Sequence, residues 1–327
     1  MRGGWTPAGR VVCVGETMAA LAPDPPGRLE DAEGLRLSVA GAESNVAMYL
    51  AGHGIDVAWV SALGDDPLGR RVRAAVAAAG VDVSAVRCDP GRPTGVLVKD
   101  PGPDGTRVHY YRRGSAASAL GPRLLEQEPV RSAGLLHLTG VTPALSPSCR
   151  ELVARALDVP AGGRRHAVSF DVNHRAALWP EGEAATVLRE LAGRADIVFV
   201  GLDEAQALWG EDLTTAGIRR LLPRPRILVV KDGARAASAV TEDGICTVPA
   251  LRTTVVEPVG AGDAFAAGFL AGLLRGLGLR RALRLGHCTA VSALRVTGDH
   301  GPLPEPAELE RLVNLPDEEW ATASVRE

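Results

Sequence analysis

The chain has 327 residues, of which 46% are hydrophobic and 4% aromatic, so it can bury a large aliphatic core as one big domain with an appendage. Its formal net charge of −3 and its only two lysines, Lys99 and Lys231, argue against a basic nucleic-acid surface. Five scattered cysteines, the lack of an apolar signal core and the lack of a bilayer-length apolar run predict a soluble cytoplasmic protein without a membrane partner.

The N-terminal part combines one buried strand with a separate set of short strands. We expect residues 1–9 to be a flexible tail and residues 10–16 to form the first core strand, because a β-branched run there ends at glycine. Residues 23–27 are rich in proline and resist helix and central strand alike. Residues 35–39 alternate as a half-exposed strand does.

A hairpin later in the chain completes this second set of strands. Residues 94–100 and 106–112 both alternate, and a Pro-Gly-Pro-Asp-Gly turn joins them. Together with residues 17–39 they predict a small sheet outside the core. The expected parts are an α/β core of residues 10–16, 40–92 and 116–314, a small sheet of residues 17–39 and 93–115, and a frayed acidic end at residues 315–327.

Strands and helices alternate after residue 40, which is the pattern of a three-layer fold with a mostly parallel sheet. Several of the expected strands end in polar residues or a turn glycine, namely Asp171, Asn173, Arg175, Glu204, Lys231 and Gly233. Because the carboxyl ends of parallel strands share one edge of the sheet, we expect these residues to face one ligand crevice.

Residues 255–274 carry the most specific pattern, in which a β-branched run, a glycine turn, a carboxylate and an apolar helical pattern follow one another. The N–H groups of Gly260, Ala261 and Gly262, with the positive end of the helix dipole, would form an anion hole. Asp263 beside such a hole suits a general base in phosphoryl transfer to a hydroxyl. The alternative is that Asp263 only caps the helix.

The sequence Gly-Ala-Gly-Asp-Ala-Phe at residues 260–265 resembles the C-terminal signature of ribokinase-like (PfkB) sugar kinases. In that family the glycines and the alanine form the anion hole, and the aspartate is the general base. Residues 40–47 resemble a second family signature, whose glycine and asparagine contact sugar hydroxyls, and Gly41 and Asn45 are the matching positions. A Walker-type phosphate loop is absent from the sequence.

The sequence Tyr-Tyr-Arg-Arg-Gly-Ser-Ala-Ala-Ser at residues 110–118 is similar to a segment of 2-keto-3-deoxygluconate kinases. A neutral sugar gives no reason to bury a guanidinium, whereas a carboxylate pairs with one through charge-assisted hydrogen bonds. Arg112, with Tyr110 beside it, is therefore the candidate ligand of a sugar-acid carboxylate. By the same resemblance Arg175 approaches that carboxylate or the transferred phosphate.

The resemblance also implies ATP and Mg²⁺ as cofactors. The expected nucleotide ligands are Lys231, Gly233, Gly262 and His287. Asp171 and Glu204 would act on the metal through water. K⁺ is a further cofactor of some members, at a site beside the glycine turn where this chain has Glu257 and Pro258 in place of Asp-Thr. The small sheet matches the family's lid over the sugar, through which many relatives form dimers.

The expected fold is therefore α/β and ribokinase-like, with a three-layer α/β/α core, a mostly parallel sheet and a small β-sheet lid. The expected function is ATP-dependent phosphorylation of the terminal hydroxyl of a sugar acid, 2-keto-3-deoxygluconate above all, by a homo-oligomer such as a homodimer. A kinase for a neutral sugar such as fructose or ribose is the first alternative. A sugar-sensing pseudokinase is the second, and Asp263 argues against it because sensing needs no base.

Overall fold

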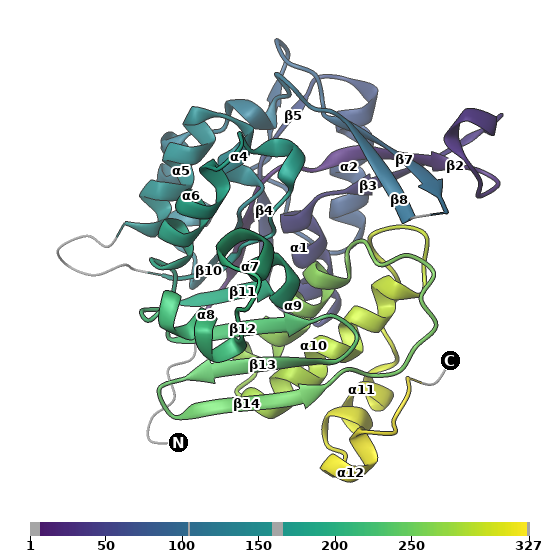
Figure 1. The fold of residues 1–327 in the computed structure, drawn as a ribbon. Coiled ribbons are helices and arrows are strands. Elements are labelled where there is room, and N and C mark those ends of the chain that lie inside the picture. Colours follow the sequence, from purple (N-terminus) through teal and green to yellow (C-terminus); the bar gives the residue numbers. More distant parts are fainter. Residues whose placement is uncertain (1–6, 104, 159–165, 326–327) are drawn as a thin grey trace.

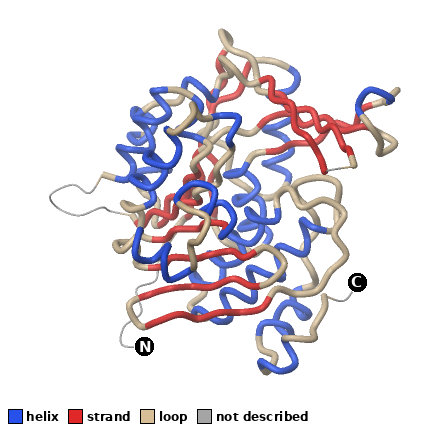
Figure 2. The backbone as a smooth tube through the Cα atoms, viewed as in Figure 1, coloured by secondary structure: helices blue, strands red, loops and turns tan. Residues whose placement is uncertain are grey.

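In the computed structural model, which describes residues 7–103, 105–158 and 166–325, the core is one eight-stranded sheet between two layers of helices (Figures 1 and 2). Six neighbouring strands run parallel, and an antiparallel hairpin extends one edge. The sheet order is β4 (Val57–Val60), β1 (Val11–Val14), β9 (Leu135–Thr139), β10 (Ala167–Asp171), β11 (Ile197–Gly201), β12 (Ile227–Asp232), β13 (Ala236–Thr241) and β14 (Gly244–Pro249). The predicted three-layer, mostly parallel core is thus confirmed.

Both faces of this sheet are apolar, and each is covered by its own helices. Val11 and Cys13 pack in one cluster while Val12 belongs to the other, so successive residues of one strand serve both layers. One layer holds α1 (Ala42–Gly52), α2 (Pro67–Ala78), α9 (Ala261–Leu274), α10 (Leu279–Leu294) and α11 (Pro306–Val313). The other holds α5 (Pro147–Leu157), α6 (Glu183–Ala192), α7 (Leu202–Trp209) and α8 (Thr215–Leu221).

Further short elements lie between these strands and helices along the chain. They are the strand pair β5 (Ala62–Gly64) and β6 (Arg87–Asp89) and the helices α3 (Glu128–Arg131) and α4 (Thr142–Leu145). Among the described residues, no helix has both the length and the apolar character needed to cross a bilayer. Of the flexible tail expected at residues 1–9, residues 1–6 lie outside the described part of the chain.

A separate four-stranded sheet, the β-lid, stands beside the carboxyl edge of the core sheet (Figure 1). Its order is β3 (Leu35–Ala40), β2 (Met18–Pro23), β7 (Val96–Gly102) and β8 (Gly105–Tyr111). The predicted hairpin forms, since β7 and β8 pair antiparallel with Leu97 opposite Tyr110. The early strands join it, since β2 runs parallel to β7.

Helix α9, which begins at the glycine turn, is held rigidly by its neighbour α10. A Cβ atom at Gly268 would lie 2.5 Å from the Leu285 carbonyl oxygen, so the small residue lets the two helices approach closely. Every residue of α9 from Asp263 to Leu273 is buried. The start of this helix is therefore fixed with respect to the core.

The C-terminal end is ordered within the described residues, contrary to expectation. Residues Asp317–Trp320 form α12, and Trp320 is only 2% exposed. Its indole N–H donates to the Pro249 carbonyl at 2.9 Å, and the Arg284 guanidinium lies 4.9 Å from its ring centroid. The prediction of a frayed end is therefore wrong for residues 315–325, because one buried aromatic side chain outweighs an acidic composition.

We predict that Trp320→Ala lowers the free energy of unfolding by about 3–5 kcal/mol, because truncating a buried tryptophan leaves a cavity. Chemical denaturation followed by circular dichroism measures this change. Glu318→Ala, an exposed change in the same short helix, is the matched control and should leave stability near that of the parent. If Trp320→Ala were as stable as Glu318→Ala, the prediction of a frayed C-terminal end would stand.

Candidate active site

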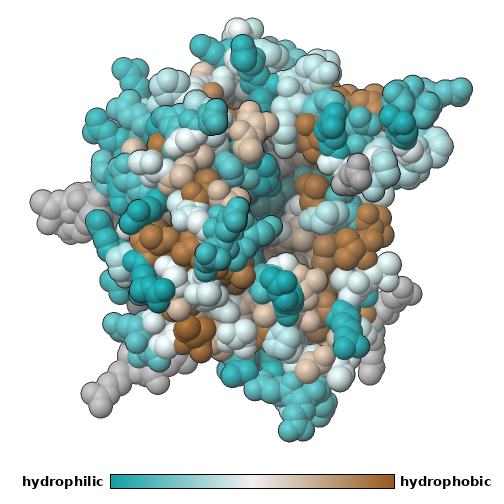
Figure 3. Space-filling view, viewed as in Figure 1, coloured by the Kyte–Doolittle hydropathy of each residue, from teal (hydrophilic) through white to brown (hydrophobic). Residues whose placement is uncertain are grey.

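A cavity of about 630 Å³ lies between the β-lid and the carboxyl ends of the core strands. Figure 3 shows this face of the molecule hollowed between the two parts. The β-lid lines it with Leu97, Lys99, Val108 and Tyr110, and Arg112 follows directly after β8. The core lines it with the ends of β10, β11 and β12 and the starts of α1 and α9. The predicted crevice at the strand ends is therefore present.

The glycine turn, residues 257–263, forms one wall of the cavity. Gly260 has a φ of +86°, and a Cβ atom there would lie 2.5 Å from the Asp299 carbonyl oxygen, so a larger residue does not fit. The first N–H groups of a helix have no intrahelical acceptor. Gly260 and Gly262 line the cavity, but the Ala261 N–H donates to the Pro258 carbonyl at 3.3 Å. The Ala261 N–H therefore already has an acceptor in this structure, and the anion hole expected of the three N–H groups stays a prediction.

Asp263 lies in the first turn of α9, 8% exposed, and two amide groups hold its carboxylate. Asn45 Nδ2 donates to one oxygen at 2.9 Å, and Asn173 Nδ2 donates to the other at 3.3 Å. Burial raises the pKa of Asp263 to about 7, opposed by the Asn45 hydrogen bond and reinforced by the Asp171 charge. A carboxylate that titrates near neutral pH is suited to take a proton from a hydroxyl.

Asn173 owes its place at Asp263 to an unusual backbone. Its φ is 40°, which makes it the one non-glycine residue with a positive φ in the described part of the chain. Asparagine tolerates this region better than most residues, and such conformations cluster at functional sites. The turn after β10 therefore aims an amide at the base.

A half-buried ammonium group links the ends of the two strands that flank β11 in the sheet. Lys231 Nζ, at the end of β12, donates to Asp171 Oδ2 at 2.7 Å. Burial lowers the pKa of Lys231, but the carboxylates of Asp171 and Glu204 outweigh it, so the pKa is raised and the ammonium stays charged. Burial and the Asp171 charge in turn raise the pKa of Glu204. The site thus holds a fixed cation between two acids.

These acids fit a magnesium ion that is held mainly by phosphate and water. Asp171 Oδ1 is buried without a hydrogen-bond partner, which leaves one oxygen for a ligand. Both oxygens of Glu204 accept backbone hydrogen bonds, from Gly201 at 3.0 Å and from His174. Among the described residues no three acidic, histidine or cysteine side chains form a metal cage. Mg²⁺ commonly takes one or two carboxylates and keeps several waters.

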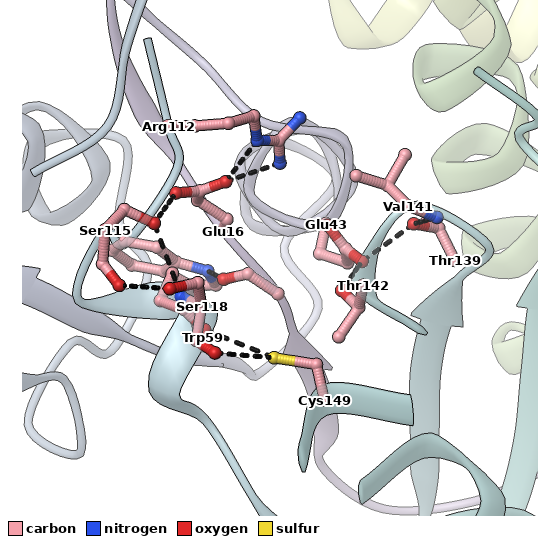
Figure 4. Close-up of polar contacts among 12 residues, drawn as sticks. Glu16, Glu43, Trp59, Arg112, Ser115, Ser118, Thr139, Val141, Thr142 and Cys149 are labelled. Carbon is pink, nitrogen blue, oxygen red and sulfur yellow. Dashed lines mark hydrogen bonds and ion pairs between the residues drawn. The ribbon is translucent and has the colours of Figure 1, made fainter. Parts of the chain in front are cut away.

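Arg112 lies in the cavity wall at 9% exposure and is paired with Glu16, which follows β1 (Figure 4). Its Nε donates to Glu16 Oε2 at 2.7 Å, and a second guanidinium nitrogen contacts the same oxygen. Ser115 Oγ donates to the other oxygen at 2.5 Å. The Tyr110 ring centroid lies 5.5 Å from the guanidinium carbon, within cation–π range. Glu16 therefore fixes where the guanidinium meets the cavity.

The other residues predicted to bind substrate also reach the cavity. Gly41 and Asn45, at the start of α1, line it as expected. Arg175 lines it from the loop after β10, where its guanidinium donates to the His174 carbonyl at 3.1 Å. Arg175 is exposed, so its side chain can turn toward a bound anion.

Two predicted nucleotide ligands are not brought to this cavity. Gly233 lies in the turn after β12, with a φ of +49°. His287 is 6% exposed and packs between the rings of Phe265 and Trp320, and its Nε2 is hydrogen-bonded to the Val248 carbonyl at 3.2 Å. Burial lowers the pKa of His287 to about 4, against that hydrogen bond. The structure therefore makes His287 a core residue, which corrects the expected nucleotide contact.

The cavity also contains polar residues that were not predicted as site residues. They are Glu16, Lys99 and Asp299, all buried. Glu16 carried a detectable signal, since it follows closely on a core strand. Lys99 is one of only two lysines. Asp299 has no local signal, because its partner lies 200 residues away.

Comparisons with known proteins agree with this geometry. A model of the pfkB family carbohydrate kinases matches residues 8–306. The chain is 35% identical over 309 residues to 2-dehydro-3-deoxygluconokinase of Thermoproteus tenax, covering 93% of this chain and 94% of that protein. It is 36% identical over 305 residues to the enzyme of the same name from Bacillus subtilis, covering 90% and 92%.

A solved structure has the same fold. The crystal structure of a PfkB protein from a Polaromonas species superimposes with a TM-score of 0.82 at 38% identity, over 92% of this chain and 99% of that one. The family match spans most of the chain and includes the cavity, the glycine turn and Asp263. The chain therefore belongs to the pfkB family of carbohydrate kinases and is a sugar kinase.

Proposed function

We propose that this sugar kinase transfers the γ-phosphate of ATP to the terminal hydroxyl of 2-keto-3-deoxygluconate, giving 2-keto-3-deoxy-6-phosphogluconate and ADP. The observation that carries the proposal is the buried guanidinium of Arg112 in the cavity that also contains Asp263. A sugar carboxylate can pair with a guanidinium as an ion pair with bidentate geometry, whereas a neutral sugar offers only uncharged oxygens. The names of the two curated relatives support the same substrate.

Asp263 acts as the general base. Its carboxylate accepts the proton of the terminal hydroxyl as that oxygen bonds to the γ-phosphorus and the bond to the β-phosphate oxygen breaks. The amides of Asn45 and Asn173 hold the carboxylate in place for this transfer. The β-lid covers the reacting groups and excludes water, which would otherwise compete as acceptor.

The transferred phosphoryl group is stabilised by N–H groups and by the Lys231 ammonium. A Cβ atom at Gly262 would lie 3.4 Å from Lys231 Nζ, so the ammonium lies directly beside the glycine turn. Preorganised donors of this kind stabilise charge that develops in the transition state. Asp171, and Glu204 through water, would hold Mg²⁺, which neutralises phosphate charge when bound.

The proposed enzyme is a cytoplasmic homodimer that pairs through the β-lid. Leu35 is 46% exposed and Tyr111 is 69% exposed on this sheet, which leaves apolar surface for a second copy. All five cysteines are free thiols, as suits a reducing compartment.

The first test measures ADP release with Mg-ATP and four acceptors: 2-keto-3-deoxygluconate, its galactonate epimer, fructose and ribose. We expect a kcat/KM for an acid at least about 10-fold above that for either neutral sugar, because charge-assisted hydrogen bonds contribute roughly 1.5–3 kcal/mol. A preference for fructose or ribose would make the protein a neutral-sugar kinase. If none of the four acceptors supported ADP release, the sugar-sensing pseudokinase would be favoured.

A paired variant tests Arg112 within the same assay. Removing Arg112 alone would leave the Glu16 carboxylate buried and unpaired, so both charges are replaced in Glu16→Gln/Arg112→Met. We expect the preference for the acid to disappear while turnover of a neutral sugar is kept. Arg113→Ala, an exposed neighbour, is the matched control.

We predict that Asp263→Asn lowers kcat by roughly 10² to 10⁴ and leaves KM for the sugar nearly unchanged, because a base acts mainly in the transition state. Asn45 can turn its amide to pair with the new residue, since its Oδ1 is unpartnered in the parent. Steady-state kinetics at saturating ATP measure both constants. Near-normal turnover would remove Asp263 from the role of base.

The raised pKa of Asp263, about 7 against an ordinary value of 3.8, sets two pH dependences. Activity should rise through pH 7 to a plateau, because only the ionised carboxylate accepts a proton. Stability should change in the opposite sense. The folded state binds more protons than the unfolded state between the two pKa values, so the free energy of unfolding falls as pH rises through this range. Denaturation of parent and Asp263→Asn at pH 5 and pH 8 measures this, and an equal pH response would contradict it.

A further inference from the structure

The β-lid carries a buried positive charge that the proposed reaction does not use. Lys99 lies in β7, 4% exposed, and its ammonium donates to Asp299 Oδ1 at 2.8 Å and to the Thr297 carbonyl at 3.3 Å. Asp299 is itself only 7% exposed and lies beyond the end of α10. A methionine at position 99 would fill similar space without a charge, so packing of the lid does not explain the ammonium.

The partner of Lys99 is the residue against which the glycine turn packs. A Cβ atom at Gly260 would lie 2.5 Å from the Asp299 carbonyl oxygen and 3.0 Å from its Cα. Any displacement of the Asp299 backbone would therefore change the support of Gly260. Lys99 holds the Asp299 side chain, and so the lid reaches the anion hole through a single intermediate residue.

A second contact links the β-lid to the other flank of the same turn. Thr106 Oγ1, in β8, donates to Glu257 Oε2 at 3.1 Å, and Glu257 Oε1 accepts the Val259 N–H at 3.3 Å. Glu257 is 8% exposed. The lid hairpin thus reaches the glycine turn directly from β8, through Thr106, and indirectly from β7, through Lys99 and Asp299.

We infer that Lys99 is a positioning residue for phosphoryl transfer, through which the β-lid sets the glycine turn by way of Asp299. The inference rests on the proposed function, because it assumes that the turn binds the transferred phosphate. Tyr110 of the same hairpin lines the cavity in which the sugar is proposed to bind. A bound sugar that holds the lid in place would therefore also hold the glycine turn in place. Phosphoryl transfer would then be favoured when the sugar site is occupied.

Three substitutions at one position separate charge from packing. Lys99→Met keeps the volume and removes the charge, Lys99→Arg keeps the charge, and Lys99→Ala leaves a space that propylammonium matches atom for atom. We expect Lys99→Met to lower kcat by about 10- to 100-fold, the usual cost of slightly misplaced groups, with KM for the sugar changed less than about threefold. Lys99→Arg should keep most of the activity.

Added propylammonium should restore kcat of Lys99→Ala in a saturable way and leave the parent unaffected. Thr106→Val should give a smaller loss of kcat, and Arg107→Ala, an exposed change on the same strand, should give none. Parent-like kcat in Lys99→Met would overturn the inference. So would a large rise in sugar KM, which would make Lys99 a substrate ligand.

The assay uses whichever sugar the parent phosphorylates, so a failed substrate assignment does not obscure the result. Circular dichroism identifies a variant that does not fold, and Thr106→Val then carries the test, with unchanged kcat as the refuting result. The rise in melting temperature caused by Mg-ATP gives a reading without turnover. It should be smaller in Lys99→Met than in the parent, and an equal rise would count against the role of Lys99.

Discussion

A charge removed from water must be paired, and around the cavity this chain pairs buried and half-buried cations with carboxylates from distant segments. The pairs are Lys231 with Asp171, Lys99 with Asp299 and Arg112 with Glu16, across 60, 200 and 96 residues of sequence. Apolar pairs of similar size would hold the fold as well or better. The charges therefore make sense as features of a site that handles phosphate and carboxylate groups, and each pair also fixes two segments relative to each other.

Asp263 shows how burial and hydrogen bonding are balanced in this site. With a pKa far below 7 the carboxylate would be ionised at neutral pH but would be a weak base. With a pKa far above 7 it would be protonated and could not accept a proton. Burial and the nearby Asp171 raise its pKa, while the Asn45 amide lowers it. The resulting pKa of about 7 depends on the position of Asp263 at the start of α9. That position is fixed because α9 packs closely against α10 through small residues.

The β-lid contributes more than a cover. Its inner face lines the cavity, and the segment that leaves β8 carries the Arg112 guanidinium held by Glu16. Its hairpin contacts the glycine turn directly through Thr106, and through Lys99 it contacts Asp299, against which Gly260 packs. Recognition of the acceptor and support of the phosphate site therefore share one small sheet, although these segments lie far apart in the chain.

Local patterns in the sequence were sufficient for the core and for the centre of the site. Apolar runs, helical spacing and the glycine turn depend on neighbouring residues, so the parallel sheet, the lid hairpin and the positions of Gly260, Gly262 and Asp263 could be predicted. Tertiary structure alone decided which side chains are buried and with whom. It turned His287 into a core residue, ordered the chain end through Trp320, and brought Asp299 to Lys99. Burial and ion pairing depend on residues that are distant in sequence, and a single sequence carries no local signal for them.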